Sequence, residues 1–241
     1  MSYAGRMAEE VNKKRILFIL GLLVAVVFLF WVGIVLYKDR AYNIISIMIM
    51  VLACIPFYAA YEKKEGDIRR LVIIAALTAI AVVGRFVFGP IPFFKPVTAV
   101  VIITAIYLGS EAGFLVGSLS AVISNIFFGQ GPWTPFQMAA WGVIGLIAGF
   151  PPVKRLLKTK PGLVVYGVFS GILFSAIMDI WTVLSYEGVF NWARYLAAQA
   201  TALSATITYA VSNVVFLLIG IKPIGKKLER IQIKHKIFIK E

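Results

Sequence analysis

The feature that most constrains this chain is a stretch of 42 residues, 112–153, without a single Asp, Glu, Lys or Arg. Soluble domains carry about 25% charged residues, so a charge-free run of this length is not expected in a soluble domain. A membrane helix needs about 20 apolar residues, and the stretch has room for two. Prolines and glycines between 129 and 135 mark the break between the two helices.

The rest of the chain has the same apolar character. Of its 241 residues, 61% are hydrophobic and 15% are charged, and the mean hydropathy is +0.91. This composition excludes a disordered chain and indicates a polytopic membrane protein. Its length leaves no room for a soluble catalytic or nucleotide-binding domain beside the spans. The one cysteine, Cys54, excludes an intramolecular disulfide framework.

Apolar runs separated by charged or Pro/Gly-rich segments predict an all-α polytopic membrane helical bundle. The expected spans are 16–37, 41–61, 71–88, 97–108, 112–128, 136–150, 162–184 and 195–221. The charged segment 62–70 is the best internal boundary. We therefore expect an N-terminal segment with two spans (1–70), a six-helix core (71–221) and a basic tail (222–241).

The net charge of +13 is explained by membrane topology, because the basic residues cluster between apolar runs. With the N-terminus inside, the inner segments hold 19 Lys and Arg and the outer segments hold 5. The positive-inside rule then predicts a multi-pass protein of the cell membrane with both termini cytoplasmic. No nucleic-acid partner is expected.

Two charged residues lie at membrane depth, near the outer ends of their spans: Arg85 in span 71–88 and Asp179 in span 162–184. Intramembrane charges are costly, so they usually pair or line a wet cavity. Three interpretations stay open: an ion pair between the two, an unpaired Arg85 that reaches to the interface, and contact with a ligand.

Amide and indole side chains from several spans lie at the same depth. Gln137 and Trp141 share one helical face, since they are four residues apart. Each amide alone could be interhelical glue, but their common depth suggests a polar cavity that opens outward. The candidate substrate-binding residues are Arg85, Asn125, Gln130, Trp133, Gln137, Trp141, Asp179 and Gln199.

The chain lacks the motifs of the competing functional classes. It has no Gly-Lys-Ser/Thr phosphate loop, and its one histidine, His235, is in the tail. Asp179 is the one deep acid, which argues against an ion-coupled carrier with a mid-membrane carboxylate. We expect no enzyme activity, no cofactor and no metal site.

Small residues recur at four-residue spacing. Glycines at 109, 113 and 117, at 145 and 149, and at 167 and 171 predict close helix packing. Ala75 and Ala79 leave a smooth helix face, which could pack internally or against another protein.

On these residues the sequence resembles the substrate-binding S components of energy-coupling factor (ECF) transporters, over residues 71–221. Ala75-x-x-x-Ala79 matches the small-residue coupling motif of that family, and Leu108-Gly-x-x-x-Gly-x-x-x-Gly117 resembles a turn common to many members. The segment 128–137, Phe-Gly-Gln-Gly-Pro-Trp-Thr-Pro-Phe-Gln, resembles the cobalamin subgroup.

The resemblance implies a small six-helix vitamin receptor that captures its substrate from outside, most simply cobalamin or a related corrinoid. It also implies docking, through the alanine face, on a transmembrane coupling protein driven by two cytosolic ATPases. The two extra N-terminal spans depart from the six-helix pattern.

Two other functions remain open: a stand-alone secondary carrier of a small molecule, and a membrane scaffold that transports nothing. Ligand binding by the chain alone, with uptake that needs partner ATPases, separates the receptor from both.

Overall fold

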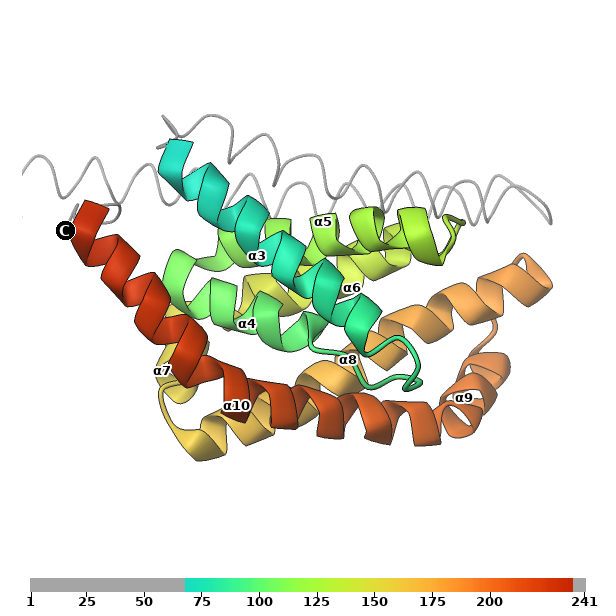
Figure 1. Cartoon of the computed structure of the whole chain (residues 1–241). Helices are drawn as coiled ribbons and strands as arrows, with labels where there is room; N and C mark the ends of the chain where they lie inside the picture. Colours follow the sequence, from blue (N-terminus) through green and yellow to red (C-terminus); the bar gives the residue numbers. More distant parts are fainter. Residues whose placement is uncertain (1–67, 236–241) are drawn as a thin grey trace, which may run out of the picture.

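The computed structural model of the chain describes residues 68–235, which form eight α helices and no strand (Figure 1). This confirms the predicted all-α bundle. The predicted spans 16–37 and 41–61 lie outside the described residues.

Six of the helices correspond to the six predicted core spans. They are α3 (Ile68–Val87), α4 (Val97–Leu108), α5 (Ser110–Phe128), α6 (Thr134–Ala148), α8 (Lys160–Glu187) and α10 (Leu203–His235). Two short helices, α7 (Pro151–Leu156) and α9 (Trp192–Thr201), lie between them in sequence. In the described part, α3, α5, α8 and α10 are long and apolar enough to cross a membrane, and α4 and α6 are shorter apolar helices. The chain is therefore a multi-pass membrane protein.

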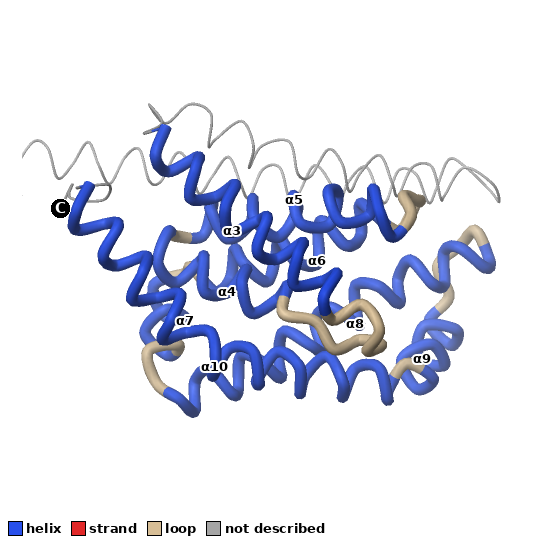
Figure 2. The backbone as a smooth tube through the Cα atoms, viewed as in Figure 1, coloured by secondary structure: helices blue, strands red, loops and turns tan. Residues whose placement is uncertain are grey.

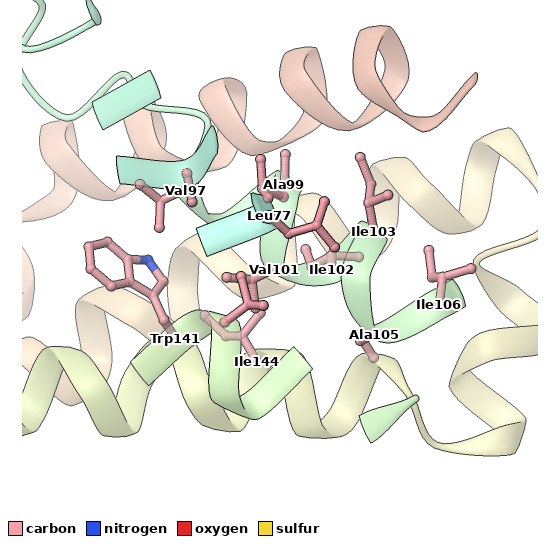
Figure 3. Close-up of a cluster of buried hydrophobic side chains, with 14 of the residues drawn as sticks. Leu77, Val97, Ala99, Val101, Ile102, Ile103, Ala105, Ile106, Trp141 and Ile144 are labelled. Carbon is pink, nitrogen blue, oxygen red and sulfur yellow. The ribbon is translucent and has the colours of Figure 1, made fainter. Parts of the chain in front are cut away.

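Helix α4 is the centre of the bundle. Eleven of its twelve residues are buried, and α3, α5, α6 and α10 all pack against it. Figure 3 shows its side chains among those of Leu77, Trp141 and Ile144. A helix that is apolar on every side needs such surroundings. At 12 residues it is about 18 Å long, shorter than a membrane core of about 30 Å, which its enclosure by longer helices permits.

Glycine determines two local features of the core. Gly109 alone joins α4 to α5, with φ at 93°, a conformation that side chains with a Cβ rarely adopt. Helices α5 and α6 approach so closely that a Cβ on Gly113 would lie 2.9 Å from the carbonyl oxygen of Gly145, and one on Gly117 would lie 2.6 Å from the carbonyl carbon of Trp141. The close packing predicted from the glycine spacing is confirmed at Gly113, Gly117, Gly145, Gly149, Gly167 and Gly171, whereas a Cβ on Gly109 would meet nothing within 4 Å.

The turns gather at two ends of the bundle (Figure 2). One end, the basic end, carries the start of α3, the Gly109 turn, α7, the loop from α7 to α8 with the first residue of α8, and the last part of α10. The other, the Arg85 end, carries the loops 88–96, 129–133 and 188–191. Between residues 68 and 235, eleven of the fourteen Lys and Arg belong to the segments of the basic end.

The predicted span 195–221 is wrong as a single helix, because the chain turns at Ala202 between α9 and α10. The side chain of Asn191 caps α9 by accepting from the N–H groups of Ala193 and Arg194. With Arg194 and Gln199 among its ten residues, α9 is too polar to form half of a membrane span. Helix α10 instead continues past residue 221 to His235. Figure 1 shows that it bends, and Pro223 inside the helix gives the physical cause.

Candidate functional site

Arg85 on the last turn of α3 is buried at the Arg85 end, with 8% of its surface exposed. Its guanidinium donates hydrogen bonds to the hydroxyl of Ser124 and, at 2.8 Å, to Oδ1 of Asn125, both on α5. It also lies over two rings, 4.8 Å from the centroid of Phe128 and 5.4 Å from that of Trp141. Such cation–π contacts stabilise a desolvated cation.

Asn125 connects Arg85 to α6. Its amide nitrogen donates to Oγ1 of Thr134 and to Oε1 of Gln137, each at 2.8 Å. The hydroxyl of Thr134 then donates to Oε1 of Gln130 at 3.0 Å. We call Arg85, Ser124, Asn125, Thr134 and Gln137 the Arg85 network. It joins α3, α5 and α6 at one depth, so three of the predicted site residues meet directly.

Asp179 and Gln199 form a separate pair. Nε2 of Gln199 on α9 donates to Oδ2 of Asp179 on α8 at 2.6 Å. Within the described residues the carboxylate of Asp179 forms no ion pair with Arg85. The ion pair that the sequence left open is therefore not made, because each group has found a neutral partner on a neighbouring helix.

Trp141 lies between the Arg85 network and an aromatic row. Its ring stacks on Phe174 of α8, with centroids 5.1 Å apart, and Phe174 meets the edge of Tyr209 on α10 at 4.9 Å. Its indole N–H donates to the hydroxyl of Thr98 on α4 at 3.2 Å. Partners on α3, α4 and α8 therefore hold this indole in one orientation.

Gln130 and Trp133 lie on the loop before α6. Gln130 is exposed, and its amide nitrogen donates to the carbonyl of Val122 at 2.7 Å. Trp133 is 36% exposed and stands immediately before the first residue of α6. The hydrogen bond from Thr134 links Gln130 to the Arg85 network, whereas the side chain of Trp133 has no hydrogen bond or ring contact to that network.

Sequence reasoning missed several residues of this end, above all Lys95, Phe128 and Thr134. The ammonium of Lys95 lies 5.4 Å from the centroid of Phe128. Ser212 of α10 accepts from the backbone N–H of Lys95 at 2.8 Å and donates to its carbonyl at 3.1 Å. A cation in a proline-rich loop was the one available signal in the sequence. Its anchor lies 117 residues away in the chain, which no local pattern reveals.

A second feature, a groove between α3 and α5, lies on the side of the bundle. Ala75 and Ala79 are exposed there, and they belong to an apolar groove of about 310 Å³. Its lining residues are Ala75, Thr78, Ala79, Val82, Val83, Leu119 and Ile123. In the described part of the chain, no group of three His, Cys, Asp or Glu is placed to hold a metal.

Comparison with known proteins places this chain in a family. The family model for the ECF-type riboflavin transporter S component matches residues 66–230. Among curated relatives, a UPF0397 protein of Aliivibrio fischeri strain MJ11 is 28% identical over 165 residues, which cover 60% of this chain and 88% of the relative. A UPF0397 protein of Clostridium perfringens strain SM101 is 26% identical over 173 residues, covering 65% of this chain and 90% of the relative. No solved structure matches the chain.

Proposed function

This chain belongs to the family of ECF-type riboflavin transporter S components, and we propose that it is the substrate receptor of an ATP-driven vitamin uptake system. An S component is the substrate-binding subunit of a transporter. The partners we propose are a transmembrane coupling protein and two cytosolic ATPases. The ATPases supply the energy of ATP hydrolysis, because this sequence contains no phosphate loop of its own.

The observation that carries the proposal is the Arg85 network. A buried cation on α3 is hydrogen-bonded to hydroxyl and amide groups of α5, and through Asn125 to α6, at one end of an otherwise apolar bundle. Binding sites combine an apolar and aromatic lining with a few placed polar groups, and Phe128, Trp141 and Phe174 supply the aromatic part. We propose that this end faces outward and that both termini are cytoplasmic, which the basic residues of the opposite end support.

The substrate we propose is a vitamin with a conjugated ring system. The segment 128–137 resembles the cobalamin subgroup, and cobalamin or a related corrinoid therefore stays our prediction from the sequence. The family carries the name of riboflavin, which makes riboflavin the competing substrate. Both contain a conjugated ring system that aromatic side chains can contact, the isoalloxazine of riboflavin and the corrin of cobalamin.

Binding and uptake measurements test the receptor function. The purified full-length chain should bind one of these vitamins without any partner, and the visible absorption of a co-purified molecule would distinguish a flavin from a corrinoid. Uptake into cells should require the coupling protein and both ATPases. Uptake by the chain alone, driven by an ion gradient, would mean a secondary carrier. Absence of both binding and uptake would favour a scaffold.

The groove on α3 is the coupling surface in this proposal, since small exposed residues let a partner helix approach closely. We predict that Ala75→Trp combined with Ala79→Trp abolishes uptake and leaves vitamin binding unchanged. Ile80→Trp is the matched control, because Ile80 is exposed on the same helix but does not line the groove. Normal uptake by the double variant would remove the coupling role of this face.

A further inference from the structure

We infer that the substrate presents a negatively charged group, a phosphate or a carboxylate, to Arg85 and Lys95 beside the ring of Phe128. This inference rests on the proposed receptor function and adds a substrate class to it. It concerns charge, which neither the family name nor the resemblance to a subgroup specifies.

Two cations converge on one aromatic ring at the Arg85 end. The guanidinium carbon of Arg85 lies 4.8 Å from the centroid of Phe128 and the ammonium of Lys95 lies 5.4 Å from it. The two charges are therefore at most about 10 Å apart. Phe128 itself is 42% exposed, so a ligand can reach the space beside its ring.

No carboxylate of the described chain neutralises either cation. Of the four carboxylates between residues 68 and 235, Glu111 and Glu229 belong to segments of the basic end. Glu187 pairs with Arg194, and Asp179 accepts from Gln199. Arg85 bonds to two neutral groups, and its Nε is buried without any hydrogen-bond partner in the structure. Buried charges are normally paired, so the partner of these two cations is expected to come from outside the described part of the chain, and we assign it to the substrate.

Two hydrogen bonds between its backbone and Ser212 determine the position of Lys95. Ser212 holds its backbone N–H and its carbonyl together, which ties the loop 88–96 to α10. Burial and the positive charge of Arg85 both lower the pKa of Lys95. An anion between the two side chains would oppose both effects and raise the pKa of Lys95, because it pairs with the charged form of each side chain.

Two pairs of probes that differ by a phosphate test the inference on the full-length protein. FMN differs from riboflavin by a phosphate, and cobalamin differs from cobinamide by the nucleotide loop with its phosphodiester. In whichever of the two pairs binds, we expect the phosphate-bearing vitamin to bind about tenfold tighter or more than its partner without phosphate. This is the factor for one charge-assisted hydrogen bond. Lys95→Met should remove most of this difference, and Lys95→Arg should keep it. Arg194→Met is the matched control, since it removes a cation from the same end that already has a carboxylate partner.

Equal affinities within the pair that binds, or tighter binding of the member without phosphate, would overturn the inference and leave the receptor function intact. If neither the flavins nor the corrinoids bind, the protein is not a receptor for these vitamins, and the anion site is then tested directly. Inorganic phosphate, compared with chloride at equal ionic strength, should then raise the melting temperature of the wild type more than that of Lys95→Met. An identical rise in both proteins would overturn the anion site.

Discussion

At the scale of residues, Asn125 is the side chain on which the Arg85 end depends. It is 1% exposed and its amide serves Arg85, Thr134 and Gln137 together. Both ends of the amide are used, with the oxygen as acceptor and the nitrogen as donor. A residue of similar size without polar atoms would leave all three partners short of a bond.

We therefore predict that Asn125→Leu lowers the free energy of unfolding by about 1–3 kcal/mol, the cost of leaving a buried polar group unpaired. Denaturation of the purified protein in detergent, without vitamin, measures this loss. Gln130→Ala is the control, because Gln130 is exposed at the edge of the same set of bonds. Equal stability of the two variants would show that the network contributes little to folding.

Lys95 should make the binding of an anionic vitamin dependent on pH. Its pKa lies below the ordinary 10.5, since burial and the charge of Arg85 disfavour the ammonium. The bound anion favours the ammonium, so affinity is complete below the pKa of the free protein and falls as the pH rises through it. We predict a decline of affinity for the phosphate-bearing vitamin in the alkaline range below 10.5. Titrations from neutral pH upward measure it, and Lys95→Arg should bind independently of pH there. A decline of the same size in Lys95→Arg would assign it to another group.

At the scale of elements, packing around α4 explains how a short helix holds its place. The last backbone carbonyls of α4 have no hydrogen-bond donor within the helix. Arg70 of α3 donates to the carbonyl of Leu108 at 3.0 Å, and Gln232 of α10 donates to that of Tyr107 at 2.6 Å. The extension of α10 beyond Pro223 therefore belongs to the fold, because it carries one of these two caps.

The α5–α6 crossing should tolerate no added side chain. A Cβ on Gly117 would meet the backbone of Trp141 and Gly142, neither of which can move without separating the helices. We predict that Gly117→Ala costs about 1–3 kcal/mol of stability and disturbs the indole of Trp141 at the site. Gly220→Ala is the matched control, since its Cβ would meet the flexible ends of Ile103 and Ile224 at 3.2 and 3.6 Å. Thermal melting of both variants, with tryptophan fluorescence, provides the comparison. Gly117→Ala as stable as Gly220→Ala would contradict the close crossing.

At the scale of the whole molecule, charge divides the bundle into two ends. The Arg85 end has three cations in the described part, Arg85, Lys95 and Arg194, and the other end has eleven. By the positive-inside rule such an asymmetry follows the orientation in the membrane, and it supports the proposed receptor, whose site faces the medium and whose ATPases are cytosolic.

Thiol labelling of intact cells tests this orientation. In a Cys54→Ala background, we predict that a membrane-impermeant reagent labels Pro132→Cys, which lies on the exposed loop at the Arg85 end. Lys158→Cys, exposed at the basic end, should react only after the membrane is opened. The reverse labelling pattern would mean that the protein has the opposite orientation, with the candidate site on the cytoplasmic side.

The sequence by itself determined the class of this protein and most of its helices. Apolar runs and their Pro/Gly breaks predict α4 at its observed bounds and α3 within three residues of its start, because the cost of unpaired backbone in a membrane forces helices onto such runs. Depth along each helix also follows from residue number, so Arg85, Asn125 and Gln137 were correctly expected at one level.

Only the tertiary structure decided which of these groups touch. Whether Arg85 bonds to Asp179 or to Asn125 depends on how α3 and α5 rotate about their axes as they pack, and the glycines that permit that packing constrain closeness without specifying partners. The same holds for Lys95, whose place beside Phe128 is maintained by a serine 117 residues away. Side-chain partners across helices are properties of the packed bundle, since they require the relative positions of segments that the chain itself leaves free.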